Sequence, residues 1–336
     1  MRAVVRVVMV IAVALAAACA PRVQELGPAA FKGGVKPRIT ESGFITPDGR
    51  TLGLTVWKAP EPRAIIVALH GMNDYARAFA LPAAWWAEHA GITTYAYDQR
   101  GFGRSPGRGI WPGHELLKAD LDLFIQLVRI RHPGLPVYVL GDSMGGAVAI
   151  ATAAQYRPEV EGMILVAPAL WGWSTLPFGH RALLWLSAHL FPGMEVTGSG
   201  LDILPSDNIE ELRRMSKDPL VIKGTRTDAV YGIVELMEHA YKSVPEVGLP
   251  GLLAYGEKDQ IIPKKPVQHA ITRFCAPLKV AIYPDGYHLL LRDLQAETVW
   301  RDVAAWIGNG GDGGLPSGAE KPKKAKAAVC AKREGS

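Results

Sequence analysis

Short apolar runs alternate with longer amphipathic segments along most of the chain. The apolar runs have the length of buried strands and occur at 64–70, 92–98, 136–142, 161–168, 251–257 and 279–285. Apolar residues recur with a helical period at about 79–90, 114–132, 144–157, 264–275 and 293–307. Continuous apolar strands separated by such helices indicate a mostly parallel sheet that is covered on both faces. We therefore predict an α/β fold.

Two segments depart from this alternation. Residues 39–60 form a predicted hairpin, whose strands are separated by the turn sequence Pro47-Asp48-Gly49. Residues 169–248 contain no convincing strand and carry Trp171, Trp173 and Trp185. Because about eighty residues are too many for a loop without secondary structure, we expect a helical cap insert above the sheet. The folded domain is then predicted to cover 38–307.

The N-terminus has the pattern of an export signal. A basic start is followed by an apolar run from Val7 to Ala18. This run is shorter than the ~20 residues that cross a bilayer, so residues 1–18 are predicted to be a signal peptide. The sequence ALAAAC, which ends at Cys19, is similar to a bacterial lipoprotein signal, although Leu15 stands one place too early. Ordinary cleavage at Ala18 or Ala20 is the alternative.

Lipidation of Cys19 would hold the protein at a membrane through a flexible tether at 19–37. We accordingly expect a lipid-anchored protein of the bacterial cell envelope that faces the periplasm, with a secreted or soluble periplasmic protein as the alternative. Residues 308–336 are rich in Gly, Lys and Pro and are predicted to form a disordered basic tail. The three cysteines, Cys19, Cys275 and Cys330, imply no disulfide framework.

The chain of 336 residues carries a net charge of +5, which raises the question of a polyanionic partner. Two basic residues precede the apolar N-terminal run, and the predicted tail holds six basic and three acidic residues. The remaining residues, 19–307, contain 29 basic and 29 acidic side chains, so the predicted domain is neutral. A role in binding nucleic acid therefore loses its main support.

Candidate chemistry begins at residues 141–146, whose sequence GDSMGG lies between a predicted buried strand and a predicted helix. It fits the pattern G-x-S-x-G, in which a serine at a sharp strand-to-helix turn projects its oxygen above the sheet and small neighbours relieve the crowding. The pattern alone arises often by chance, and a serine that caps a helix is the alternative. Its place between strand and helix favours Ser143 as a nucleophile.

A serine nucleophile needs a histidine base that is oriented by a carboxylate. Asp259 lies just beyond the predicted strand at 251–257, and His288 lies just beyond the next strand. The order serine, acid, histidine recurs in hydrolases that place these residues at the ends of parallel strands. We therefore predict a triad of Ser143, Asp259 and His288, with Glu257 and Asp293 as alternative acids; Asp293 is expected instead to cap the final helix.

Acyl transfer also requires hydrogen-bond donors for the oxyanion that develops in the transition state. We expect one donor to be the backbone N–H of Met144, and the second to be that of Met72 in the loop after the first apolar run. His70 is expected to fix this loop. In the turn YDQRGFGRS, Asp98 and Arg100 are expected to fix loop geometry, since Pro106 stands where a dinucleotide fingerprint needs its third glycine.

The stretches HGMNDYA, YDQRGFGRS, GDSMGG, GEKDQIIP and DGYHLLL resemble those of the α/β-hydrolase superfamily, and within it the monoacylglycerol lipase and lysophospholipase-like serine hydrolases. The resemblance covers about residues 40–307. It implies a helical cap over a lipophilic tunnel and the hydrolysis of esters, often monoacylglycerols. The chain departs from the group at Asp142, where histidine is usual. Alternation along the strand predicts that this carboxylate points away from Ser143.

The sequence thus predicts a serine hydrolase that cleaves carboxylic esters of the monoacylglycerol or lysophospholipid type through an acyl-enzyme, without a metal or cofactor. The tryptophans of the insert would either form an apolar entry for an acyl chain or only pack within the cap. A perhydrolase or carbon–carbon bond hydrolase would keep the same triad, and a non-catalytic envelope lipoprotein is a further alternative. The expected partners are an ester substrate and, through Cys19, a membrane.

Overall fold

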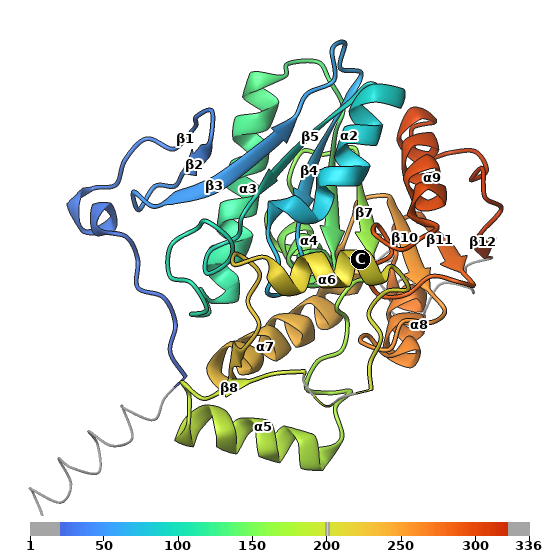
Figure 1. The fold of residues 1–336 in the computed structure, drawn as a ribbon. Helices are drawn as coiled ribbons and strands as arrows, with labels where there is room; N and C mark the ends of the chain where they lie inside the picture. The colour runs from blue at the N-terminus through green and yellow to red at the C-terminus, as the bar shows by residue number, and fades with distance from the viewer. Residues whose placement is uncertain (1–20, 199, 201, 322–336) are drawn as a thin grey trace, which may run out of the picture.

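The computed structural model describes residues 21–198, 200 and 202–321 (Figure 1). The predicted signal peptide, Cys19 and residues 322–336 lie outside the described residues, so the predictions made for them stay predictions. No helix within the described part of the chain is long and apolar enough to cross a membrane.

A ten-stranded sheet forms the centre of the described structure. Its strands lie in the order β1-β2-β3-β5-β4-β6-β7-β10-β11-β12. Their bounds are β1 Arg38–Ile39, β2 Gly43–Ile45, β3 Thr51–Trp57, β4 Ala64–Leu69, β5 Ile92–Tyr97, β6 Val137–Asp142, β7 Gly162–Val166, β10 Gly251–Gly256, β11 Leu278–Tyr283 and β12 Glu320–Lys321. Neighbouring strands are parallel from β5 to β11, whereas β1, β2, β3 and β12 pair antiparallel at the two edges.

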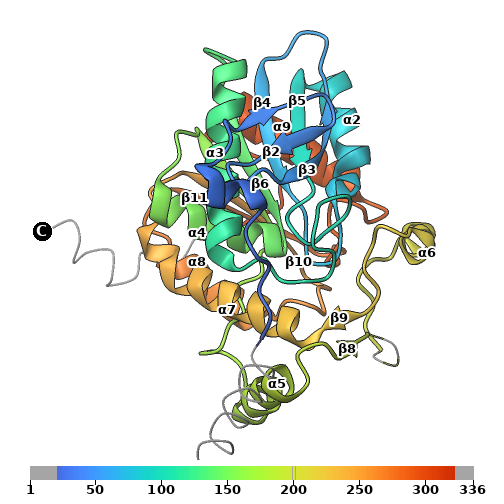
Figure 2. The same ribbon diagram turned by 90° about the vertical axis from the view of Figure 1, so that its left-hand side faces the viewer.

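Helices cover both faces of the sheet (Figure 2). One face carries α2 (Ala80–His89) and α9 (Ala296–Gly308) together with the short 3-10 helix η2 (Ala76–Phe79). The other face carries α3 (His114–Arg131), α4 (Met144–Tyr156) and α8 (Lys264–Arg273). Side chains alternate between the two cores along each strand; in β6, Val139 faces α4 while Leu140 faces the α2 side. The predicted mostly parallel sheet with helices on both faces is confirmed.

The insert between β7 and β10 is built mainly from three helices, α5 (Phe178–Leu190), α6 (Ile209–Lys217) and α7 (Thr227–Ser243). It also contains a small antiparallel pair, β8 (Glu195–Val196) with β9 (Thr225–Arg226), and the 3-10 helix η3 (Val244–Glu246). Helix α7 packs on α4, and α5 packs on α7. The insert contacts the loop after β4, where the N–H of Ile222 donates to the carbonyl of Asn73 at 2.9 Å. It therefore lies at the end of the sheet at which the parallel strands finish.

The segment before β1 lies against the domain. It contains the 3-10 helix η1 (Pro28–Lys32). The N–H of Gln24 donates to the carbonyl of Trp111 at 2.9 Å, and that of Gly27 donates to the Asp48 carboxylate at 2.7 Å. The expectation of a flexible tether was therefore wrong for these described residues, because backbone contacts that have no sequence pattern hold the segment in place.

Residues 308–321 also differ from expectation. Strand β12 pairs with β11, Leu315 is buried, and the N–H of Ser317 donates to Asp302 at 3.0 Å. Predicted disorder was thus wrong for this part of the tail, where one buried leucine and an added edge strand anchor a glycine-rich stretch. Cys275 is disulfide-bonded, which corrects the expectation drawn from the cysteine count, and the other cysteines lie outside the described residues.

Candidate active site

Ser143 occupies the turn between β6 and α4 in a strained backbone conformation, with φ 52° and ψ −113°. Such a positive φ is rare for a residue with a side chain and indicates that the surrounding structure enforces the turn. A Cβ atom on Gly145 would lie 2.1 Å from the carbonyl oxygen of Leu69, and one on Gly141 would lie 2.5 Å from backbone atoms of Gly145. The glycines are therefore required because backbone approaches backbone on both sides of the serine.

The loops after β10 and β11 bring the predicted partners to Ser143. His288 Nε2 lies 3.0 Å from Ser143 Oγ, and His288 Nδ1 lies 2.9 Å from Asp259 Oδ2. Because a carboxylate can only accept, Nδ1 carries the ring proton and Nε2 is left to accept from the serine hydroxyl. Asp259 is held in turn, since its Oδ1 accepts from the N–H groups of Ile261 and Ile262. The three side chains form one hydrogen-bonded series.

The surroundings of His288 tune its basicity. Burial alone would lower the pKa of this imidazole, but the hydrogen bond and charge of Asp259, aided by Asp142, raise the pKa above 6.5. The positive charge of Arg292 acts in the opposite direction. A buried histidine beside a carboxylate thus keeps the proton affinity that a general base requires.

The alternative acids lie elsewhere. Glu257 forms an exposed ion pair with Lys264, 2.9 Å apart. Asp293 accepts hydrogen bonds from Ser206 Oγ at 2.6 Å and from the N–H of Tyr287 at 2.7 Å. The expectation that Asp293 caps the final helix was wrong, because Gln295 is the N-cap residue of α9. Of the candidate acids, Asp259 is the one that contacts His288.

The two predicted oxyanion donors lie on either side of the serine. Met144 begins α4, so its N–H has no partner inside the helix. Gly71 places the loop after β4 close to the turn, since a Cβ atom on it would lie 3.3 Å from Ser143 Cβ. Within the described residues, neither the Met72 nor the Met144 amide donates to a protein group.

His70 fixes the loop that carries Met72. Its Nε2 accepts from the N–H of Gln99 at 2.9 Å, while Nδ1 lies 2.8 Å from the carbonyl of Gly71. Burial lowers the pKa of His70, which keeps the ring neutral and suited to this pair of contacts. Asp98 and Arg100 likewise pair with structural partners: Asp98 with Arg104, and Arg100 with Asp48 and Asp120.

Asp142 lies nearer to the site than alternation alone suggests. It continues the β6 face that carries Leu140, away from α4. Its carboxylate is nevertheless buried and acts electrostatically on His288. Burial, only partly offset by Arg292 and His288, raises the pKa of Asp142 to about 6. Arg292 did not emerge as a site residue from the sequence, where its one signal is a charge that closes the apolar run after His288.

Comparison with known proteins places this arrangement in a family. Residues 60–295 match the sequence profile of the family described as serine aminopeptidase, S33, which is more than half of the chain. The chain belongs to this family. It is an α/β-hydrolase that resembles the monoacylglycerol lipases, as the sequence motifs indicated.

Several relatives of this family member are monoacylglycerol lipases by name. A monoacylglycerol lipase of Mycolicibacterium smegmatis is 29% identical over 281 residues, which cover 80% of this chain and 96% of the relative. The human monoglyceride lipase is 26% identical over 272 residues, covering 79% and 89%. The crystal structure of Paleococcus ferrophilus monoacylglycerol lipase has a TM-score of 0.66 at 24% identity and covers 77% of this chain and 99% of that one. The structural likeness shows the fold, and the sequence relatives support carboxylic ester hydrolysis.

Proposed function

We propose that this family member hydrolyses lipid carboxylic esters, of the monoacylglycerol or lysophospholipid type, through an acyl-enzyme on Ser143. The observation that carries the proposal is the hydrogen-bonded series Asp259–His288–Ser143, which ends on a strained strand-to-helix turn. A serine that merely capped a helix would need neither a buried histidine at 3.0 Å nor a carboxylate behind that histidine.

In the proposed reaction, Ser143 Oγ attacks the ester carbonyl carbon while its proton passes to His288 Nε2. The carbonyl oxygen becomes an oxyanion that accepts hydrogen bonds from the N–H groups of Met72 and Met144. His288 then protonates the leaving alcohol, and the acyl group stays on Ser143. A water molecule that gives its proton to His288 then attacks the acyl carbon. The bond from the acyl carbon to Ser143 Oγ breaks, His288 returns the proton to Oγ, and the acid is released. Asp259 stabilises the imidazolium in both steps.

The surface of the insert supports a lipid substrate. Helix α5 and the residue after it leave large apolar side chains between 49% and 78% exposed: Phe178, Leu183, Trp185, Leu186, Leu190 and Phe191. Exposed apolar side chains in such numbers are typical of a surface that contacts another protein or a membrane. Trp171 and Trp173 instead pack against the core, and the apolar entry for an acyl chain stays a prediction. The lipophilic tunnel stays a prediction.

A membrane location is proposed on similar grounds. If Cys19 is lipidated, the anchor leaves the domain beside the insert, because the N–H of Arg22 donates to Asp228 on α7 at 3.3 Å. Helix α5 packs on that same α7 (Figure 1). The anchor and the exposed apolar residues would then face one bilayer of the bacterial cell envelope. Exchange of Cys19 for Ser is expected to release the protein from the membrane fraction, and unchanged membrane association would reject the anchor.

The proposed function is tested with an acyl-chain series. Monoacylglycerols, lysophospholipids and soluble p-nitrophenyl esters are assayed with the wild type and with Ser143→Ala, and an aminoacyl p-nitroanilide is included because of the family's description. We expect ester hydrolysis that depends on Ser143 and little anilide hydrolysis. Full esterase activity in Ser143→Ala would reject the nucleophile, and preference for the anilide would reject the substrate class.

A further inference from the structure

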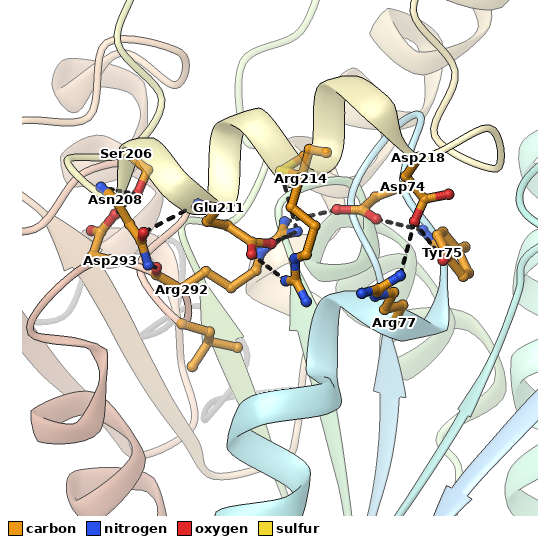
Figure 3. Close-up of polar contacts among 12 residues, drawn as sticks. Asp74, Tyr75, Arg77, Ser206, Asn208, Glu211, Arg214, Asp218, Arg292 and Asp293 are labelled. Carbon is orange, nitrogen blue, oxygen red and sulfur yellow. Dashed lines mark hydrogen bonds and ion pairs between the residues drawn. The ribbon is translucent and has the colours of Figure 1, made fainter.

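A cluster of buried charges joins the His288 loop, the loop after β4 and the insert (Figure 3). Arg292 stands at its centre, four residues after His288, and is 4% exposed. Its Nη2 lies 2.7 Å from Asp74 Oδ2, and its Nη1 lies 3.4 Å from Glu211 Oε1. Asp74 follows the predicted oxyanion donor Met72 by two residues, whereas Glu211 belongs to α6. One guanidinium therefore contacts both loops that carry the chemistry and the insert above them.

The segment before α6 is bound to the His288 loop along its length. The N–H of Leu289 donates to the carbonyl of Pro205 at 2.9 Å, and Asn208 Nδ2 donates to the carbonyl of Arg292 at 2.9 Å. The N–H of Leu294 donates to Asp207 at 2.9 Å. These contacts fix the position of α6 relative to the loop, so a shift of either is transmitted to the other.

Charge strengthens the case for a role beyond packing. Three buried carboxylates attract the charge of Arg292: Asp74, Asp142 and Glu211. Burial would lower the pKa of Arg292, but this attraction outweighs the burial and raises the pKa, so the guanidinium stays charged. Arg214 also pairs with Glu211. Without the guanidinium, Asp74 would be a buried carboxylate that has lost its ion-pair partner beside the oxyanion loop, a state that is strongly unfavourable.

We propose that Arg292 is a positioning residue of the active site, which holds the Met72 loop and the His288 loop in their catalytic arrangement and fixes α6 of the insert to both. The proposal rests on the proposed function, because it assigns Arg292 a role in setting the oxyanion donor and the base. Arg292 itself does not touch the reacting atoms. It acts through Asp74 on one side and through its own loop on the other.

The test compares kcat per titrated active site for the wild type, Arg292→Met and Arg292→Lys. Active sites are counted by the burst of p-nitrophenol from a slowly deacylating ester. We expect Arg292→Met to lower kcat about 10- to 100-fold with little change in KM, because misplaced donors and base weaken the transition state more than substrate binding. Arg292→Lys keeps the charge but loses the fork that reaches two carboxylates, and it is expected to recover only part of the loss.

Two controls separate positioning from simple destabilisation. Arg100→Met removes another buried arginine, which pairs with the carboxylates of Asp48 and Asp120 and not with those of Asp74 and Glu211. Asp218→Asn loosens the far end of α6, where Asp218 accepts from Tyr75 and Arg77 (Figure 3), without touching Arg292. Both are expected to lower the melting temperature and to leave kcat per titrated site within about twofold.

The outcomes are distinct. Loss of kcat per site in Arg292→Met alone, with partial recovery in Arg292→Lys, supports the proposal. A wild-type value of kcat per site in Arg292→Met, or an equal loss in Arg100→Met, overturns it and leaves Arg292 a structural residue. An inactive wild type would instead reject the proposed function itself, which the Ser143→Ala comparison detects separately.

Discussion

Replacement of Asp142 by Asn tests whether the carboxylate beside the nucleophile is a charge that the fold holds at a cost. Burial raises the pKa of Asp142 from 3.8 to about 6, because no described group hydrogen-bonds to its carboxylate and Arg292 only partly offsets the burial. The folded pKa lies above the unfolded one, so folding is penalised wherever the unfolded chain is ionised. The penalty is absent well below pH 3.8, grows through the interval to about 6 and is constant above it.

The size of the effect follows from the same two values. A difference of about 2 between the pKa values corresponds to about 3 kcal/mol at pH 8, of which about 1 kcal/mol remains at pH 4.5. Asn keeps the shape of the side chain and carries no charge. We therefore expect Asp142→Asn to be more stable than the wild type by about 3 kcal/mol at pH 8 and by about 1 kcal/mol at pH 4.5.

The assay is urea unfolding of both proteins at the two pH values. Asp312→Asn is the matched control, because Asp312 is exposed and its loss removes one carboxylate without relieving a buried charge. This control is expected to change the unfolding free energy by less than about 0.5 kcal/mol at either pH. Equal stability of Asp142→Asn and wild type at pH 8, or a difference that does not depend on pH, would refute the reasoning.

Three further predictions concern the turn and the triad. Because the neutral imidazole is the base and the pKa of His288 is raised, kcat/KM should fall as the pH drops through a value above 6.5. Asp142→Asn should move this acidic limb of the pH profile to lower pH, since Asp142 helps to raise the pKa of His288. An acidic limb that stays in place would show that Asp142 does not act on His288. Gly145→Ala should lower the free energy of unfolding, measured in urea, by about 2 kcal/mol or more, because its Cβ would lie 2.1 Å from the carbonyl oxygen of Leu69. By contrast, Gly179→Ala in α5, with open space around the new methyl group, should be neutral or stabilising, and equal costs would contradict the argument. Asp259→Asn should lower kcat by about a thousandfold or more, while Glu257→Gln should change kcat by less than about threefold. The reverse order of effects would identify Glu257 as the acid of the triad.

The sequence predicted those parts of the fold that depend on local pattern. The strand run 136–142 and the helix run 144–157 correspond to β6 and α4 within a residue. The same pattern put Ser143 at the turn and placed Asp259 and His288 beyond neighbouring strand ends, where parallel topology brings them together.

What the sequence did not reveal depends on contacts between distant segments. Asp74, Glu211 and Arg292 lie in three separate parts of the chain, and no periodicity links them, so their cluster emerges only from the tertiary structure. Leu315 anchors a stretch whose composition is that of a disordered tail, since composition does not record a strand added at a sheet edge. For the same reason the contacts of residues 21–27 with the domain had no signal in the sequence.

The central claim is that Ser143 is the nucleophile, and its most direct test is covalent labelling. Purified protein is treated with a fluorophosphonate, digested, and analysed by mass spectrometry to locate the adduct. We predict one phosphonyl group per chain on Ser143, no adduct in Ser143→Ala, and a labelling rate that falls with the protonation of His288. Folded wild-type protein that takes no label, or that takes it at another residue with Ser143 unmodified, would contradict the account.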